Sequence, residues 1–403
     1  MNVKVLQVNC VIKEGSTGKI TYDIHQHLLH NREQSVVICG RRAPKDDANV
    51  YGVVSELRGK LNHLWAKISG VMYGGCLLST EKIKRIIKKE KPDIVHLQCI
   101  NGYFCNIFRL LVFLKKLGVP TVLTLHAEFM YTSNCSYAGD CEQWKNGCKK
   151  CAANKTACHS LFFDRTSYSW NRMHNIYKDW DNLHIIACSK WIADRAGQSG
   201  EMAHRDIRVI YNGIDNNTIF YPHPNARERI IEKYNLPKDK NIVVYVSPGL
   251  SARKGFDMFL DLVHKCQNDQ LHFLVVGGEY DGDESNITVI GKVTDRDLLA
   301  QLYSASDAFV ICSRNDNYPT VCLEANSCST KVVGFDVGGV SETIYENMGT
   351  VVPFGDIDAL REALLCVVKS KADDKTVENA RVKHSKNRMV SEYMDLYQSL
   401  IEK

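Results

Sequence analysis

The chain is 403 residues long, carries a formal net charge of +5 at pH 7, and is 44% hydrophobic and 24% charged. These values are ordinary for a soluble globular protein, and the length favours two domains over a single core. A charge this mild does not favour nucleic-acid binding, which usually needs a concentrated basic face. The sequence has no apolar run of about 18 residues and no signal-peptide pattern at its start, so we expect a cytoplasmic protein with reduced thiols.

Short apolar segments rich in Val and Ile alternate with segments of helical period along the chain. In the first half they predict strands at Lys4–Val11, Ser35–Cys39, Asp93–Leu97, Thr121–Leu125, His184–Cys188 and Ile207–Tyr211. In the second half they predict strands at Ile242–Ser247, His272–Val276, Thr288–Ile290, Ala308–Cys312, Lys331–Phe335 and Thr350–Val352. Apolar runs without strict alternation are typical of strands buried on both faces of a parallel sheet. We therefore predict an α/β protein with two doubly wound domains and a cleft between them.

The domain boundary is predicted near Ile207–Tyr221, because turn-forming residues follow there: Asn212-Gly213-Ile214-Asp215 and two prolines. This gives a first domain at 1–208 and a second at 209–376.

Residues 129–158 interrupt the alternation with a long, irregular, cysteine-rich segment. In a compact domain such a segment is usually functional, or it needs a cross-link or a metal ion to hold it in place. Four of its cysteines follow the spacing C-x5-C-x6-C-x2-C: Cys135, Cys141, Cys148 and Cys151. Four thiolates are a closed tetrahedral set for a structural zinc ion, with Cys158 and His159 as spare ligands. The alternative interpretation is a group of reduced thiols packed with Trp144 and Tyr137.

One stretch of the second half has the pattern of a strand, a polar loop and a helix that begins near Pro319. The backbone N–H groups around Thr320 and Val321, together with the helix dipole, favour a phosphate at the carboxyl end of the sheet. Asp316 in the loop could hold sugar hydroxyls, and Glu324, about one turn into the helix, could accept both ribose hydroxyls. The alternative is a solvated loop acid and an ordinary helical Glu.

This stretch resembles the acidic signature of glycosyltransferase family 4, which reads Glu, seven residues, Glu-Ala. Asp316 stands at the first Glu, and Glu324-Ala325 match the second. The resemblance covers nearly the whole chain and implies a GT-B fold, two Rossmann-like domains facing each other across a cleft. It also implies retaining transfer from a nucleotide-diphosphate sugar with no catalytic metal. Further donor-binding contacts are implied at Asn317, Tyr318, Thr320 and Val321.

A second motif of the family follows the first strand of the second domain, where a Lys holds the donor diphosphate; here it is Lys254. Two cations beside a diphosphate offset its charge. The family's usual Arg five residues earlier is Gly249 in this chain, so we infer that Arg253 takes over part of that task. The alternative is a basic pair at a solvated helix start. The resemblance also implies that the loop from Gly338 to Glu342 borders the nucleotide.

In the first domain, Gly15 and Gly18 lie in a loop similar to the family's glycine-containing loop, whose amides lie under the donor phosphates or the acceptor. The spacing is not that of a P-loop. His126 ends a predicted strand where the family places a His near the donor sugar, although a lone His is more often structural. His96 is assigned to packing. The family also implies that 377–403 form a helix that returns to the first domain.

The predicted function is thus a glycosyltransferase of hexosyltransferase type, acting on a glycan or lipid-linked saccharide in capsule or exopolysaccharide biosynthesis. The basic amphipathic segment Lys82–Lys91 could rest on anionic lipid as a peripheral membrane contact, or could be a solvated helix covering the sheet, which we favour.

Three other functions stay open from the sequence. A GT-B nucleotide-sugar epimerase would need no sugar acceptor. A non-catalytic partner that binds nucleotide sugar would suit the departures at Gly249 and Asp316. A nucleic-acid module at the four-cysteine loop is disfavoured, because the loop lacks a strongly basic, aromatic-interleaved surface.

Overall fold

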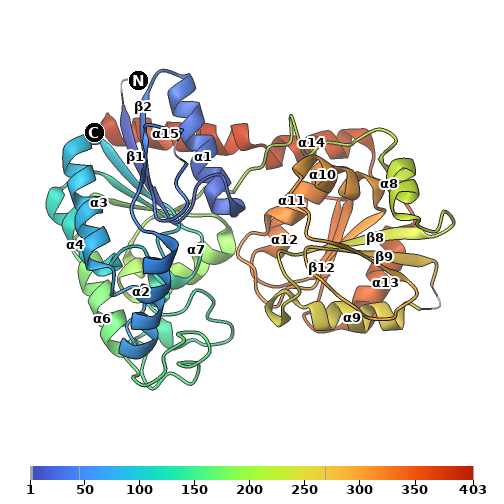
Figure 1. Ribbon diagram of the computed structural model, residues 1–403, viewed down its shortest axis with the longest axis horizontal. Coiled ribbons are helices and arrows are strands. Elements are labelled where there is room, and N and C mark those ends of the chain that lie inside the picture. Colours follow the sequence, from blue (N-terminus) through green and yellow to red (C-terminus); the bar gives the residue numbers. More distant parts are fainter. Residues whose placement is uncertain (1–2, 45, 268, 403) are drawn as a thin grey trace. The chain divides into compact units, whose positions relative to one another are not determined.

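The computed structural model describes residues 3–44, 46–267 and 269–402, which form two compact units (Figure 1). Unit 1 comprises 3–211 together with 390–402, and unit 2 comprises 212–389.

The sheet of unit 1 has seven parallel strands in the order β3-β2-β1-β4-β5-β6-β7. Its strands are β1 Lys4–Asn9, β2 Gln34–Cys39, β3 Val50–Gly52, β4 Ile94–Leu97, β5 Thr121–Leu125, β6 Leu183–Ala187 and β7 Ile207–Val209. The central strands are buried along nearly their whole length, as expected for a sheet covered on both faces. The order reverses between β1 and β4, and ligands of doubly wound sheets bind at the carboxyl ends of the strands at such a point.

The helices of unit 1 connect the strands along the chain and lie beside the sheet (Figure 1). They are α1 Gly15–His30, α2 Glu56–Ser69, α3 Leu77–Glu90, α4 Ile107–Leu117, α5 Phe129–Thr132, α6 Thr166–Tyr177 and α7 Lys190–Ala196, with 3₁₀ turns η1 Gln143–Lys145 and η2 Gly200–His204. Among the described residues no helix has both the length and the apolar character needed to cross a membrane.

The sheet of unit 2 has six parallel strands in the order β10-β9-β8-β11-β12-β13. Its strands are β8 Asn241–Val246, β9 Leu271–Val276, β10 Ile287–Gly291, β11 Ala308–Ile311, β12 Lys331–Phe335 and β13 Gly349–Val352. Its helices are α8 Ala226–Tyr234, η3 Ala252–Lys254, α9 Phe256–Lys265, α10 Arg296–Ala305, α11 Thr320–Ser327, α12 Val340–Thr343, α13 Ile357–Val367 and α14 Asp374–His384. Here the order reverses between β8 and β11.

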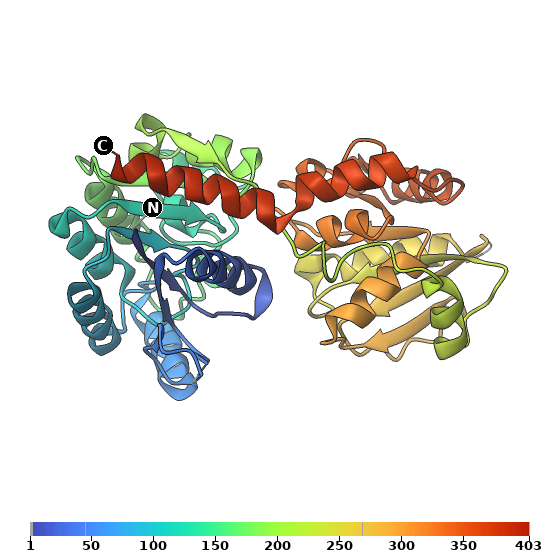
Figure 2. The same cartoon turned by 90° about the horizontal axis from the view of Figure 1, so that it is seen from above.

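The last helix, α15 Lys386–Ile401, begins in unit 2 and ends on unit 1. Its C-terminal half lies along the unit-1 sheet (Figure 2), where Tyr397 Oη lies 2.6 Å from His96 Nδ1 and Tyr393 Oη lies 3.1 Å from Thr124 Oγ1. The buried His96 is therefore a packing residue, as expected from the sequence.

Each predicted strand overlaps an observed one, and the two doubly wound sheets agree with the predicted fold. The edge strand β3 was not predicted, because it has three residues and only Val50 is buried.

The predicted domain limits need correction at the C-terminus. The compact units divide after Tyr211, and 377–389 lie in unit 2 rather than returning to unit 1. The reason is a backbone contact with a segment far away in the sequence. Ile214 N donates to His384 O and Ile214 O accepts from Lys386 N, both at 2.8 Å, so the backbone at Ser385 is extended and separates α14 from α15.

Candidate functional site

Three loops of unit 2 meet at the carboxyl edge of its sheet, at the point where the strand order reverses. One follows β8 and leads through η3 into α9, the second joins β11 to α11, and the third joins β12 to α12. Because β8, β11 and β12 are neighbours in the sheet, the residues that follow them lie side by side. This is the ligand position expected for a doubly wound sheet.

Lys254 and Asp316 join the first two loops. Lys254 Nζ lies 2.5 Å from Asp316 Oδ2, and the side chains are only 17% and 13% exposed. Ser313 Oγ donates to the same carboxylate oxygen at 3.1 Å. The predicted phosphate-binding cation and the predicted sugar-binding acid are thus one partly shielded ion pair.

Arg253 is held against the same loop through its backbone and its side chain. Its carbonyl accepts from Arg314 N at 3.0 Å, and its Nη1 donates to Asn315 O at 3.4 Å. The structure therefore brings the Arg253–Lys254 corner and the segment before α11 together within unit 2. Asn315 Oδ1 is also buried here, with no hydrogen-bond partner among the described residues.

Two glycines make this close approach sterically possible. Gly255 has φ 69°, and a Cβ there would lie 1.7 Å from Cys312 O. Gly338 has φ 59°, and a Cβ there would lie 1.9 Å from Asp316 O, while Gly339 N donates to that carbonyl at 3.0 Å. Only glycine fits either position, because both the left-handed backbone and the space exclude a side chain.

Helix α11 begins where the pattern predicted. Pro319 is its N-cap residue, no side chain caps the first turn, and that turn contains no acidic residue. Thr320 and Val321 form the start of the helix, where backbone N–H groups and the positive end of the helix dipole attract anions. Asn317 and Tyr318, just before it, are buried at 4% and 5% exposure.

Glu324 lies inside unit 2 rather than in solvent. It is 7% exposed, and the Tyr303 hydroxyl of α10 lies 3.4 Å from its Oε2. Burial, with the nearby Glu324 charge, raises the pKa of Tyr303 well above its ordinary value, so this phenol stays protonated and can donate. Tyr303 could not be identified from the sequence. It lies in a helix 21 positions before Glu324, and no motif links the two residues.

The predicted residues of unit 1 lie at the carboxyl edge of its own sheet. Gly15 starts α1 with φ 63°, and a Cβ there would meet no atom within 4 Å, so its backbone is open to a ligand. Gly18 is packed, because a Cβ there would lie 3.2 Å from Val11 Cγ2.

His126 follows β5, and its Nε2 lies 2.7 Å from Gln98 Oε1 at the end of β4. Burial lowers the pKa of His126 to about 4, so the imidazole is neutral at pH 7. With the amide oxygen as acceptor, the proton lies on Nε2. His126 can therefore act as a neutral hydrogen-bonding group.

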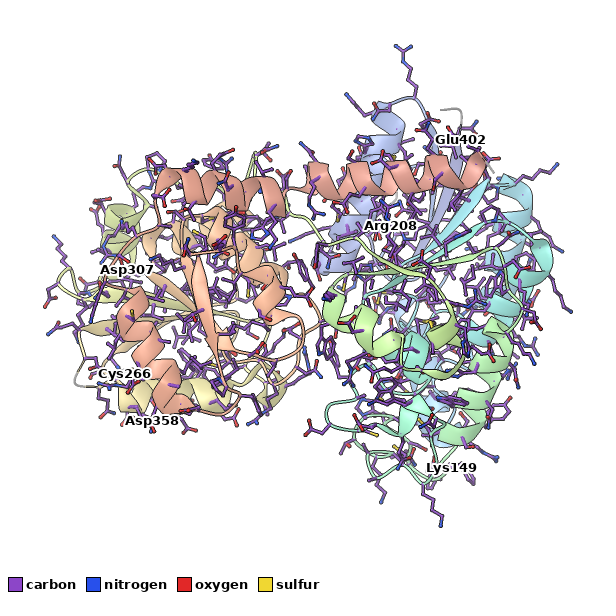
Figure 3. The ribbon with its side chains drawn as sticks, turned by 180° about the vertical axis from the view of Figure 1, so that it is seen from behind. Lys149, Arg208, Cys266, Asp307, Asp358 and Glu402 are labelled. Carbon is purple, nitrogen blue, oxygen red and sulfur yellow. The ribbon has the colours of Figure 1, made fainter. Side chains whose placement is uncertain are left out.

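The cysteine-rich segment is anchored by Trp144, which is 1% exposed. Trp144 Nε1 donates to Cys141 O at 2.6 Å, its ring packs against Tyr131, and the Arg195 guanidinium lies 4.9 Å from its centroid. Glu128, fully buried, fixes Arg195 by a 2.8 Å ion pair. Lys149 lies at the outer end of this segment (Figure 3).

The four predicted metal ligands differ in exposure: Cys148 is buried, Cys135 and Cys151 are half-buried, and Cys141 is exposed. They are electrostatic neighbours, since burial and then the nearby thiols raise the pKa of Cys148 to about 12. In the part of the chain that the structure describes, no three His, Cys, Asp or Glu side chains are grouped so as to hold a metal ion.

Comparison with known proteins gives two matching family models. Residues 17–218 match "Glycosyltransferase Family 4", and residues 226–383 match "Glycosyl transferases group 1". A relative in Escherichia coli K12, the "Putative colanic acid biosynthesis glycosyl transferase WcaC", is 23% identical over 99% of this chain and 100% of its own length. The N-acetyl-alpha-D-glucosaminyl L-malate synthase of Bacillus anthracis is 21% identical over 49% of this chain and 55% of its own length.

Solved structures with a similar fold include the sucrose-phosphate synthase of Thermosynechococcus elongatus. Its TM-score is 0.70 at 18% identity, over 99% of both chains. Anabaena Alr3699/HepE, solved in complex with UDP and with UDP-glucose, has a TM-score of 0.64 in both forms, at 16% and 17% identity, over 98% of this chain and 100% of its own.

Proposed function

The chain belongs to glycosyltransferase family 4 and is a glycosyltransferase of the GT-B fold, and we propose that it transfers a sugar from a nucleotide-diphosphate sugar with retention of configuration. The acceptor in this proposal is a glycan or a lipid-linked saccharide of capsule or exopolysaccharide biosynthesis. The reaction takes place in the cytoplasm, at the membrane surface when the acceptor is lipid-linked. The observation that carries the proposal is the meeting of Lys254, Asp316 and the start of α11 at one edge of the unit-2 sheet.

The donor diphosphate fits this edge for electrostatic reasons. Lys254 and Arg253 supply two cations, and the first turn of α11 supplies backbone N–H groups and a dipole. These groups would stabilise the negative charge that grows on the departing nucleotide. UDP and UDP-glucose bound to HepE, a protein of similar fold, support a donor of this chemical class.

The remaining roles follow from the chemistry of each side chain. Asp316 orients the hydroxyls of the donor sugar, while Glu324 accepts the ribose hydroxyls, and Asn317, Tyr318, Thr320 and Val321 line the donor. The neutral His126 contributes a hydrogen bond to the donor sugar, and the Gly15 loop contributes backbone amides. The leaving phosphate can itself take the acceptor proton, so no protein base is required.

No divalent cation is needed at the diphosphate in this proposal, because the protein supplies the positive charge. Transfer should therefore proceed in a buffer without added divalent cation. The test avoids EDTA, because a chelator could also remove a structural metal ion. Transfer that requires added magnesium would contradict this part.

A panel of nucleotide sugars, screened for thermal stabilisation, tests the proposed donor class. Product analysis with the stabilising donor then separates transfer from epimerisation, because an epimerase changes the sugar without an acceptor. Binding without turnover in the presence of saccharide acceptors would instead support a non-catalytic role. Stabilisation by no nucleotide sugar would contradict the proposal.

We also propose that Cys135, Cys141, Cys148 and Cys151 bind a structural zinc ion, with metal binding drawing these neighbouring thiols together. The support is their spacing and their mutual electrostatic effect. Elemental analysis of the purified protein should find about one zinc per chain. Cys141→Ser should lower this content, whereas Cys366→Ser, which changes an exposed thiol of unit 2, should not. A metal-free wild type that folds normally would contradict the proposal.

A further inference from the structure

Helix α2 exposes its large apolar residues and buries its small ones. Leu57 is 68% and Leu61 is 57% exposed, whereas Gly59 and Ala66 are the buried positions of the helix. A helix that covers a sheet normally does the reverse. The outer face of α2 therefore has the composition of a face that is covered by something else.

The exposed apolar residues of α2 form one stripe: Leu57, Leu61, Leu64, Trp65 and Ile68. At about 100° per residue, these positions fall within an arc of roughly 100° on the helix. Figure 1 shows α2 at the outside of unit 1, near the loops that follow β5.

A loop extends this stripe at the C-terminal end of α2. Leu161 N donates to Lys67 O at 2.8 Å, and Gly70, with φ 71°, lies so close that a Cβ there would be 2.2 Å from Phe163 O. This loop adds three exposed side chains, Leu161, Phe162 and Phe163. We call the combined set the α2 apolar surface: Leu57, Leu61, Leu64, Trp65, Ile68, Leu161, Phe162 and Phe163.

Basic residues flank the α2 apolar surface on both sides. By the same helical geometry, Arg58 lies at one edge of the stripe, and Lys60 and Lys67 lie at the other. Glu56 is the single acid in the helix sequence, and its Oε1 accepts from Arg42 Nε at 3.0 Å. The occupant of this surface should therefore combine an apolar interior with a negatively charged boundary.

We propose that the α2 apolar surface binds an anionic lipid membrane, with α2 lying in the plane of the interface. Leu and aromatic side chains between Lys and Arg are the pattern of an interfacial helix, and anionic headgroups attract the flanking cations. A symmetric contact with a second copy is less favourable, because Arg58, Lys60 and Lys67 would face the same cations. This proposal does not depend on the identity of the sugar donor.

The basic segment Lys82–Lys91 does not form a comparable apolar surface. It lies in α3 and its C-cap, and the helix buries its apolar face, with Ile83, Ile86 and Ile87 buried against unit 1. The Lys84 and Lys88 ammonium groups lie 5.8 and 5.7 Å from the Phe113 ring centroid, so they pack on α4. The solvated-helix interpretation of this segment therefore agrees with the structure.

Vesicle sedimentation of the full chain tests the proposal. We expect binding to vesicles of equimolar phosphatidylcholine and phosphatidylglycerol, and much weaker binding to phosphatidylcholine alone. Leu61→Ser with Leu64→Ser should lower binding to the anionic vesicles by roughly tenfold or more, since two apolar side chains no longer insert. Val382→Ser, which changes an apolar residue 62% exposed in unit 2, is the matched control and should bind as the wild type does.

Because the changed leucines are exposed, the double variant should keep the wild-type melting temperature and the same stabilisation by nucleotide sugar. Equal vesicle binding by the wild type and the double variant would overturn the proposal, as would no binding by the wild type. Concentration-dependent dimers that the double variant abolishes, without vesicle binding, would instead assign the face to a second copy and also overturn it.

Discussion

The Lys254 ammonium lies 2.5 Å from the Asp316 carboxylate, so the cation proposed for the diphosphate is paired with the acid proposed for the sugar. A donor that binds here must compete with Asp316 for Lys254, or share it. Each residue thus fixes the position of the other before the donor arrives, which lowers the cost of ordering the site.

Lys254→Ala should lower kcat/KM for transfer by roughly 100-fold, because the leaving diphosphate loses a charge-assisted contact. Lys254→Arg should retain part of the activity. The matched control is Lys265→Ala, which removes an exposed cation of unit 2 that pairs with Asp358. Steady-state kinetics check the effect, and full activity of Lys254→Ala would reject the proposed phosphate site.

Glu324→Gln should raise the dissociation constant of the donor nucleotide by about tenfold, since an amide accepts fewer hydrogen bonds from the ribose hydroxyls than a carboxylate does. The fold should be preserved, because Gln keeps the shape and the contact with Tyr303 Oη. Isothermal titration with the donor nucleotide measures the change, with the exposed Glu378→Gln as control. Unchanged nucleotide affinity would remove Glu324 from the site.

Gly338→Ala should reduce both stability and activity, because its Cβ would collide with Asp316 O and push that loop away from Lys254. Gly355→Ala separates backbone strain from collision. Gly355 also has a positive φ, 84°, yet a Cβ there would meet no atom within 4 Å. We expect Gly355→Ala to cost about 1–2 kcal/mol of unfolding free energy with activity intact, and Gly338→Ala to cost clearly more. Denaturant titration compares the two, and equal effects would show that the collision is relieved.

Acid should weaken the fold through two histidines that the folded chain holds in the neutral form. Burial lowers the pKa of His126 to about 4 and that of His96 to about 3, whereas an unfolded His has a pKa of about 6.5. Below pH 6.5 the unfolded chain therefore binds more protons than the folded one. The stability is complete above about pH 6.5 and is lost as the pH falls toward 4, with a slope of at most ~1.4 kcal/mol per pH unit for each group.

Two measurements check this pH dependence. The imidazole NMR signals of His96 and His126 should not titrate between about pH 5 and 8 in the folded protein. His126→Gln should also make the unfolding free energy less dependent on pH than in the wild type. An NMR midpoint for His126 near its ordinary value would contradict the prediction.

The strands and the order of the loops could be predicted from the sequence, because parallel strands leave long apolar runs and loops between them carry polar signatures. On that basis the sequence predicts that Asp316 and Lys254 each follow the end of a strand. Their ion pair could not be predicted, because it depends on which strands are neighbours, and 62 positions separate the two residues.

Other features depended on contacts that leave no local pattern. The break at Ser385 arises from Ile214, far away in sequence, and the tyrosine that accompanies Glu324 comes from the preceding helix. The exposure of the apolar face of α2 could not be predicted either. A stripe of leucines on a helix usually indicates a buried face, and only the small residues on the opposite side indicate otherwise.

The path of α15 has a consequence for shortened versions of the protein. Unit 2 is one continuous piece of chain, but unit 1 is completed only after the chain has passed through unit 2. A polypeptide that stopped at Met389 would lack Tyr393 and Tyr397, and so would leave the hydroxyl of Thr124 and the ring of His96 without those partners at the centre of unit 1. The core of unit 1 can therefore close only after residues 390–402 have been synthesised.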